Sequence, residues 1–552
     1  MKPILLPSAL LLLTACGGAD GPAPAALSPL HFTDATAGSG LVMTVTNGED
    51  PPTYLLEVKG TGIALIDYDQ DGDPDVFVPN GATVADPDRG PGCRLFENLG
   101  GLRFRDVTAA AGLEFNRWGY GVAQGDVDND GWPDLFVTCY GENALLRNTG
   151  AGGFIEVTQA AGLGGRAWST GASFGDIDAD GDLDLYVVNY CELDARQPSP
   201  QSRFLGAPVF AGPMGLPKVD DILYENDGEG RFRDVSEAAG IRMRPAAWGL
   251  GAVIIDLDGD RIQDIYVGND SMASYLYRGL GGGKFEEIGI LSGVAFNEEG
   301  AGQATMGIAV GDVDDNGRPD LFTTNFMYDT NTLHVNQGSG FFEDRTMAYG
   351  LHLDSRPFLS WATGFFDFDH DADEDLVFFN GHIYPRATCA ENGWDHDQVP
   401  VLYERDGAQF RRLAAASAGA WLAEPHNDRT AAFGDLDGDG DVDIVVGERN
   451  GPVRLLRNDR DGGDWLVVRL RDQRPGHDRF GTGAKLVLRT AAGAQRRWIA
   501  SGLSFLAASE PIAHFALPPG AGPASLEVVW SDGRRQKVEG VALRQALVVT
   551  RN

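Results

Sequence analysis

The sequence predicts an all-β fold, in which a seven-bladed β-propeller is followed by a small C-terminal β domain. Three observations lead to this prediction. A nonapeptide of the form D-x-D-x-[DN]-x-x-x-D occurs seven times, and each copy lies between a small or apolar run and a β-rich run. Two further motifs recur in step with it. Each unit of about 50 residues has room for four short strands, which is the size of one propeller blade.

The seven nonapeptides, named aspartate ladders here, alternate acidic side chains along a short loop. They are DYDQDGDPD from Asp67, DVDNDGWPD from Asp126, DIDADGDLD from Asp176, DLDGDRIQD from Asp256, DVDDNGRPD from Asp312, DFDHDADED from Asp367 and DLDGDGDVD from Asp435. Glycine at the sixth position permits a sharp backbone turn in five ladders. Arg261 and Ala372 replace it in the fourth and sixth, so we expect those two loops to be strained or weaker.

Alternating carboxylates on a tight loop are typical of a calcium site. Ca²⁺ takes six to eight oxygen ligands at about 2.3–2.6 Å. Positions 1, 3, 5 and 9 would supply side-chain oxygens, and position 7 a backbone carbonyl. We therefore predict up to seven structural Ca²⁺ ions. The predicted ligand residues are Asp67, Asp69, Asp71, Asp73, Asp75, Asp126, Asp128, Asp130, Trp132, Asp134, Asp176, Asp178, Asp180, Asp182, Asp184, Asp256, Asp258, Asp260, Ile262, Asp264, Asp312, Asp314, Asn316, Arg318, Asp320, Asp367, Asp369, Asp371, Asp373, Asp375, Asp435, Asp437, Asp439, Asp441 and Asp443.

A set of solvated acidic turns is the alternative to metal binding. One ladder alone would favour that alternative, whereas seven copies at matching places favour calcium. An EF-hand would need a bidentate Glu at position 12 and flanking amphipathic helices, and the sequence has neither. Seven bound ions would also move the formal net charge from -36 to about -22, which relieves self-repulsion.

The phase of the two accompanying motifs predicts a closed ring. A strand-and-turn motif such as LFENLG at 95 follows each ladder, and a segment of the type F-x-D-V-T-x-x-A-G-L also occurs seven times. The first such segment, at Phe32, precedes the first ladder, and none follows the last LLRN at 455. An N-terminal strand that completes the last blade explains this phase. A linear solenoid would need capping repeats, which the sequence does not show.

The ladders resemble the FG-GAP (integrin-α-like, VCBS-type) repeat. Residues 30–460 resemble the propeller of the cartilage-acidic-protein-like family, whose typical NGHIYP stands at Asn380–Pro385 and whose GPMGLPKVDDILYENDG stands at Gly212–Gly228. Residues 461–552 resemble the ASPIC/UnbV module of that family, with DRFGTGAKL at Asp478–Leu486. The module's usual W-P-x-G reads WSDG here, which weakens transfer of a binding role. We expect a small β domain stacked on the propeller.

The N-terminus predicts export and lipid anchoring. Residues 1–16 contain an apolar run too short to span a membrane, and this run ends in LTAC, which matches the bacterial lipobox with Cys16 as the lipidated residue. A coincidental cysteine is the alternative. Residues 17–29 follow as a flexible tether. We therefore expect a lipoprotein of the bacterial cell envelope, held in the outer membrane by lipid alone and facing the periplasm or the surface.

An exported protein can form disulfides, and four cysteines follow Cys16. Cys139 and Cys191 end the strands after the second and third ladders, so we expect that these adjacent-blade cysteines can pair. Free buried thiols are the alternative.

Long insertions predict which face of the ring meets a partner. If every ladder joins the first two strands of its blade, the ladders share one face, and the insertions 80–94, 190–222 and 380–401 lie on the other. Four tryptophans enter from the insertion side, namely Trp118, Trp168, Trp248 and Trp361. They form either a ring that stacks on sugars or wedges between blades.

His382, Tyr384 and Arg386 are candidate catalytic residues in the last insertion. Calcium-dependent polysaccharide lyases of propeller fold use such a cluster, in which Tyr or His abstracts a proton beside a carboxylate. Loop anchoring is the alternative, and we favour it, because the sequence contains no recognisable catalytic motif.

The sequence thus predicts a binding, scaffold or adhesion module for a protein or glycan partner on the insertion face, rather than an enzyme. An extracellular polysaccharide-active enzyme of lyase type is the alternative. The net charge of -36 argues against nucleic acid as a partner and against docking to bare anionic lipid.

Overall fold

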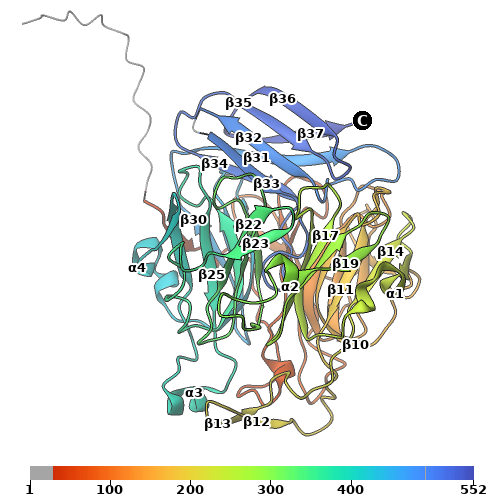
Figure 1. Cartoon of the computed structure of the whole chain (residues 1–552), viewed down its shortest axis with the longest axis vertical. Coiled ribbons are helices and arrows are strands. Elements are labelled where there is room, and N and C mark those ends of the chain that lie inside the picture. The colour runs from red at the N-terminus through yellow and green to blue at the C-terminus, as the bar shows by residue number, and fades with distance from the viewer. Residues whose placement is uncertain (1–28, 492) are drawn as a thin grey trace, which may run out of the picture.

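Antiparallel sheets arranged as a ring form most of the molecule, and a two-sheet C-terminal domain lies on one end of that ring (Figure 1). The computed structural model describes residues 29–491 and 493–552. Cys16, the predicted signal peptide and the predicted tether up to residue 28 lie outside the described residues.

Five sheets of the ring contain four strands each. They are β2 (Ala64–Ile66), β3 (Asp75–Val78), β4 (Arg94–Asn98) and β5 (Phe104–Asp106); β16 (Gly249–Ile255), β17 (Asp264–Asn269), β18 (Tyr275–Gly279) and β19 (Phe285–Glu287); β20 (Ile308–Gly311), β21 (Asp320–Thr323), β22 (Thr332–Gly338) and β23 (Phe341–Asp344); β24 (Ser360–Phe366), β25 (Asp375–Asn380), β26 (Val401–Asp406) and β27 (Gln409–Arg412); and β28 (Asp428–Gly434), β29 (Asp443–Glu448) and β30 (Val453–Asn458) with β1 (Phe32–Asp34).

One further sheet of the ring has eight strands. Its strands are β6 (Gly119–Gly125), β7 (Asp134–Gly141), β8 (Ala144–Asn148) and β9 (Phe154–Glu156), with β10 (Ala167–Gly175), β11 (Asp184–Asn189), β14 (Ile222–Asn226) and β15 (Phe232–Asp234). Each half repeats the antiparallel order of the other sheets, and the halves are joined where Ala167 and Trp168 pair with Gly141 and Tyr140. The count of seven blades requires this sheet to be divided at that bridge, and it stays a prediction.

Each ladder lies in the hairpin between the first two strands of its unit, as predicted. In the first unit, for example, Ile66 at the end of β2 pairs with Asp75 at the start of β3, and the ladder spans the turn between them. Because the last aspartate of a ladder is also the first residue of the next strand, the loop geometry is fixed by the sheet register.

The N-terminal strand closes the ring. β1 pairs antiparallel with β30, with Phe32 opposite Asn458, so the predicted completion of the last sheet by the N-terminus is confirmed. A second link supports this closure, because Asn98 Nδ2 in the first sheet donates to the Leu436 carbonyl in the last sheet at 2.9 Å.

The C-terminal domain packs two sheets around its own apolar core. One sheet contains β34 (Ile512–Leu517), β31 (Asp464–Asp472) and β37 (Gln545–Arg551), and the other contains β33 (Gly493–Trp498), β32 (Lys485–Thr490), β35 (Ala524–Val529) and β36 (Arg535–Val541). The alternating burial along β35 shows one face toward the core and one toward solvent, which is typical of an antiparallel sheet covered on one side.

Long insertions gather at the end of the ring that lies away from the C-terminal domain (Figure 1). The hairpin of β12 (Gln201–Phe204) and β13 (Ala207–Phe210) lies there beside α3 (Arg386–Asn392). The other short helices are α1 (Ser236–Ala239), α2 (Gly289–Ser292) and α4 (Ala415–Ala418), with 3-10 turns at Leu55–Glu57, Ile241–Met243 and Trp421–Ala423. We call this end the insertion end and the opposite one the ladder end.

Candidate functional site

The aspartate ladders bring carboxylates together in groups that could hold a metal ion. In each of the first five ladders, three aspartates place one carboxylate oxygen apiece within 4.8 Å of the others. These groups are Asp67, Asp69 and Asp71; Asp126, Asp128 and Asp134; Asp176, Asp178 and Asp184; Asp256, Asp258 and Asp260; and Asp312, Asp314 and Asp320. These five ladders therefore concentrate hard oxygen donors at one point, as a divalent cation requires.

Several ladder oxygens are buried without a hydrogen-bond partner. Within the described residues, this holds for Oδ1 of Asp126, Asp182, Asp369 and Asp437. Buried polar atoms are almost always hydrogen-bonded in folded proteins, so an orphaned carboxylate oxygen calls for another partner. A cation at the centre of the ladder would satisfy these oxygens, and the residues present thus fit a metal ion. Asp182 occupies position 7, where a backbone ligand was expected.

Burial changes the acidity of the ladder carboxyls. It raises the pKa of Asp75 and Asp126 to about 9, and the pKa of Asp264 and Asp320 to about 8. The cause is the loss of hydration of the charged form, and neighbouring aspartates add repulsion. A bound cation would oppose both effects and keep the carboxylates ionised.

The ninth aspartate of every ladder also has a role inside the blade. Its Oδ2 accepts the backbone N–H of ladder position 2 at 2.8–3.2 Å, and its Oδ1 accepts a backbone N–H from the third strand at 2.7–3.0 Å. These residues are Asp75, Asp134, Asp184, Asp264, Asp320, Asp375 and Asp443. One carboxylate thus fixes the loop and pins it to the sheet.

Sequence reasoning missed the asparagine that ends the strand-and-turn motif. Its Nδ2 donates to the carbonyl at ladder position 2 of the preceding unit at 2.7–3.3 Å, which links neighbouring units around the ring. The residues are Asn98, Asn148, Asn226, Asn336 and Asn458, and Arg405 does the same in the sixth unit. The recurrence of N in LFEN, LLRN and LYEN was the signal that could have revealed this role.

The sixth position of the ladder requires a left-handed backbone. Gly72 and Gly131 adopt φ of +101° and +95°, as the predicted sharp turn demands. Arg261 and Ala372 are held at φ of 77° and 82°, a region that costs side-chain-bearing residues free energy. The expected strain of the fourth and sixth loops is therefore present.

The C-terminal domain rests directly on the ladders. Four sixth-position carbonyls accept hydrogen bonds from it: Gly72 from Arg469 at 2.8 Å, Gly181 from the Asp478 N–H at 2.8 Å, Gly440 from His514 at 2.7 Å, and Gly317 from Lys485. The second ladder is reached by Arg479, which donates to the Asn129 carbonyl, and the sixth by Arg497, which pairs with Glu374 at 3.2 Å. The ladder loops therefore form the surface of the ring that contacts the C-terminal domain.

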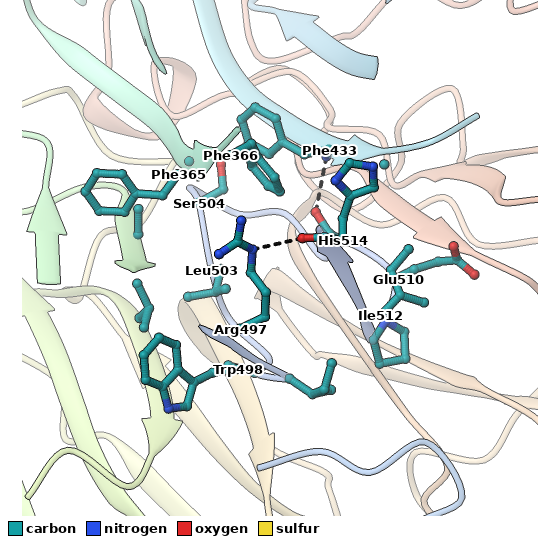
Figure 2. Close-up of a pocket in the computed structure, with 18 of the residues that line it drawn as sticks. Phe365, Phe366, Phe433, Arg497, Trp498, Leu503, Ser504, Glu510, Ile512 and His514 are labelled. Carbon is teal, nitrogen blue, oxygen red and sulfur yellow. Dashed lines mark hydrogen bonds between the residues drawn. The ribbon is translucent and has the colours of Figure 1, made fainter. Parts of the chain in front are cut away.

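A loop of the C-terminal domain enters the centre of the ring. Ser504 exchanges backbone hydrogen bonds with Ile308 of β20, and Ala508 does so with Ile63 and Leu65 beside and in β2. We call residues 499–511 the central plug. Figure 2 shows a cavity beside the central plug. Phe365 and Phe433 of the ring line this cavity together with Arg497 and His514 of the C-terminal domain. Its volume of about 120 Å³ leaves little space between the two domains.

The candidate catalytic residues do not converge on an open pocket in the described part of the chain. His382 is fully buried, and its ring stacks on Trp394 at 5.4 Å. Burial lowers the pKa of His382 to about 3, so it is neutral. Tyr384 is buried against Phe204 and Phe210 of the β12–β13 hairpin, and Arg386 pairs with Asp397. Tyr384 thus fastens its insertion to the β12–β13 hairpin, whereas His382 and Arg386 make these contacts within their own insertion, and both kinds of contact fit loop anchoring.

The four recurring tryptophans are buried in the ring. Trp118 and Trp361 are completely enclosed, and Trp248 N–H and Trp361 N–H donate to the carbonyls of Leu216 and Gly381. They act as wedges between units, so the exposed stacking ring is not formed.

The expected pairing of Cys139 with Cys191 is wrong, since all four cysteines among the described residues are free and buried. The two residues do not occupy equivalent positions. Cys139 corresponds in its strand to Asn189, two residues before Cys191, as the pairings of Gly119 with Cys139 and of Ser169 with Asn189 show. Cys139 consequently packs in one apolar cluster and Cys191 in another.

No helix among residues 29–491 and 493–552 combines the length and apolarity that a membrane span requires.

Sequence comparisons agree with this architecture. The model of the FG-GAP-like repeat matches residues 67–137, 126–187 and 256–323, and the model of the ASPIC and UnbV domain matches residues 474–552. The chain is therefore an FG-GAP repeat protein with a propeller-like ring and an ASPIC/UnbV domain.

It is homologous to cartilage acidic protein 1. It is 26% identical to this protein from Mus musculus over 327 residues, which cover 57% of this chain and 47% of the relative. The protein from Homo sapiens is likewise 26% identical over 328 residues, covering 57% and 46%. The chain thus spans about half the length of the curated relatives it matches.

Solved structures with distant likeness include an Agrocybe aegerita lectin described with non-reducing terminal N-acetylglucosamine, at 16% identity and a TM-score of 0.39, which covers 72% of this chain and 94% of the lectin. BBS1N in complex with ARL6DN is 10% identical with a TM-score of 0.38, covering 77% and 98%. At these scores the likeness carries no functional argument.

Proposed function

We propose that this protein is an exported, lipid-anchored β-propeller that binds calcium at its ladders and acts as a binding or adhesion module through its insertion end. The observation that carries the calcium proposal is the set of buried ladder oxygens without partners, such as Oδ1 of Asp126 and Asp182, in loops whose positions 1, 3, 5 and 9 are all Asp or Asn. Oxygen-only donor sets suit Ca²⁺ rather than zinc, which prefers nitrogen and sulfur.

The proposed role of the ions is structural. Each ladder is tied to its own sheet through the ninth aspartate, and four ladders offer their glycine carbonyls to the C-terminal domain. A cation that fixes the loop therefore also fixes the contact of the loop with its own sheet and its contact with the C-terminal domain. When Ca²⁺ is bound, it supplies positive charge and fixed coordination to the loop.

The insertion end is the proposed partner surface. The C-terminal domain covers the ladder end, and the central plug fills the centre of the ring from that side. Neither the ladder end nor the centre of the ring therefore offers a free surface there. The insertions at the other end carry no such cover in the described part of the molecule (Figure 1). A lyase is not put forward, because His382 and Tyr384 are buried in packing contacts at the insertion end.

Calcium binding is tested by titration of the metal-stripped protein. We expect tight binding of several equivalents of Ca²⁺, up to seven, and much weaker binding of Mg²⁺, because Mg²⁺ demands a smaller and nearly octahedral site. Isothermal titration calorimetry and metal analysis after gel filtration would measure both. Retention of less than one equivalent of Ca²⁺ would refute the proposal.

Lipid anchoring is tested by Cys16→Ser in the full chain. We expect the wild-type protein to incorporate labelled palmitate and to fractionate with membranes, and the variant to lose both properties, because the acyl chains supply the attachment. Cys93→Ser is the matched control, since this buried thiol lies inside the ring. Equal membrane association of wild type and Cys16→Ser would contradict the anchor.

A further inference from the structure

A large cavity opens at the insertion end, between the second and third units of the ring. It has a volume of about 1000 Å³ and lies where the end of β7, the start of β10 and two insertions meet. Tyr140 and Trp168 contribute aromatic lining, and Asp88 and Glu192 reach it from the insertions. This volume matches the upper range of small-molecule sites, which is enough for an oligosaccharide.

The indole N–H of Trp168 is a buried donor without a partner at this cavity. Trp168 is 2% exposed, and its Nε1 finds no hydrogen-bond acceptor among the residues that the structure describes. The equivalent Trp248 and Trp361 donate to backbone carbonyls of Leu216 and Gly381 at 3.2 and 2.8 Å. A ligand oxygen that enters the cavity would satisfy Trp168 as those carbonyls satisfy Trp248 and Trp361. Trp118 Nε1 also lacks a partner in the described part of the chain, but Trp118 does not line the cavity.

Charged groups around the cavity offer donors and acceptors in near balance. Arg166 and Arg196 both pair with Asp88, at 3.5 and 2.7 Å, and remain largely exposed to solvent. Three arginines face four carboxylates in the lining, namely Arg117, Arg166 and Arg196 against Asp88, Glu142, Glu192 and Asp194. Such a surface repels a polyanion slightly, and its apolar lining, which includes Pro217 and Val219, lies beside these charged groups. It suits hydroxyl groups, which donate and accept at once.

We propose that this cavity binds a neutral oligosaccharide, with Trp168 N–H and the surrounding guanidinium and carboxylate groups bonding to sugar hydroxyls. The inference rests on the proposed function as a binding module, because it assigns a ligand class to the insertion end. Tyr140 has a positioning role here: its hydroxyl donates to the Leu193 carbonyl at 2.9 Å and accepts the Ala195 N–H at 3.0 Å, which holds the insertion against the cavity.

The test compares two tryptophan variants of the full chain. Trp168→Phe keeps an aromatic ring and removes the N–H, and Trp118→Phe makes the same change at an equivalent buried position that is not among the residues lining the cavity. Glu192→Gln removes one exposed acceptor charge without touching the core. The probes are neutral gluco-, galacto- and N-acetylhexosamine oligosaccharides, with uronate-containing and sulfated oligosaccharides as the comparison, measured by glycan array and calorimetry in calcium.

We expect a neutral oligosaccharide to bind, with at least tenfold loss of affinity in Trp168→Phe, a smaller loss in Glu192→Gln and no change in Trp118→Phe. Equal affinities of the two tryptophan variants would overturn the site. Binding confined to the anionic probes, or to none of the panel, would overturn the ligand class. Calcium titration of the same preparations separates the two proposals, since ion binding without saccharide binding leaves the metal-stabilised module standing and removes only this inference.

Discussion

Removal of divalent cations is expected to lower the melting temperature of the protein strongly and to loosen its C-terminal domain. At free calcium of 100 times Kd, each independent site would stabilise the fold by roughly 2.7 kcal/mol, and several ladders lose this contribution together. The domain loosens because it hydrogen-bonds to carbonyls of ladder loops, including Gly72 and Gly440. Calorimetry with EDTA measures the first effect, and hydrogen exchange at Ser504 and Ala508 measures the second.

Two substitutions separate the stability that the bound ion contributes from the stability that the hydrogen-bonded turn contributes. Asp258→Asn in the fourth ladder retains the acceptor for the Asp260 N–H but removes a ligand charge, so we expect a loss of up to about 2.7 kcal/mol in calcium and little change in EDTA. Asp227→Asn is the control, because Asp227 accepts the Glu229 N–H in the same kind of turn outside the ladders. A melting temperature that EDTA leaves unchanged would exclude a structural role for the ions.

Phe505→Ala in the central plug is expected to destabilise the whole protein by about 3–5 kcal/mol. Phe505 is 1% exposed, its ring lies 5.0 Å from that of Trp361, and its carbonyl accepts the Thr430 hydroxyl of β28. Removing the phenyl group leaves a cavity where the central plug meets the ring of sheets, so the ring of sheets and the C-terminal domain should both melt at a lower temperature.

Val548→Ala serves as the control for this variant, because Val548 belongs to the same domain and is 55% exposed. Surface changes of this kind are usually within about 0.5 kcal/mol. Thermal unfolding followed by calorimetry gives the comparison. A Phe505→Ala protein as stable as Val548→Ala would show that the plug does not hold the two parts together.

The local architecture could be predicted because it is written into each repeat. The ladder position, the flanking strands and the closing role of Phe32 all follow from motifs that recur in register. One copy of a motif could form a strand, a turn or a loop, but a motif that recurs at the same place in every unit indicates the same local structure in each. The left-handed turn at Arg261 was also predictable, since five of the other six loops place glycine there.

Contacts that occur once in the chain could not be predicted. The docking of Arg469 and His514 on ladder carbonyls joins residues about 400 and 74 positions apart, and no periodic signal marks them. The Cys139–Cys191 prediction failed because counting strands ignored the two-residue offset between the cysteines. Trp168 was recognised, yet only its unpartnered N–H and its place at the cavity distinguish it from the equally buried Trp361.

The pairing of β1 with β30 has a consequence for synthesis. Phe32 emerges among the first residues of the ring and must wait for Asn458, 426 positions later, before it finds its partner strand. Contacts of such separation form slowly, and every intermediate length of the chain presents an open sheet edge that can pair with another molecule. Truncation before Val453 would leave β1 without its partner permanently, so nascent or prematurely terminated chains are the species most prone to aggregate.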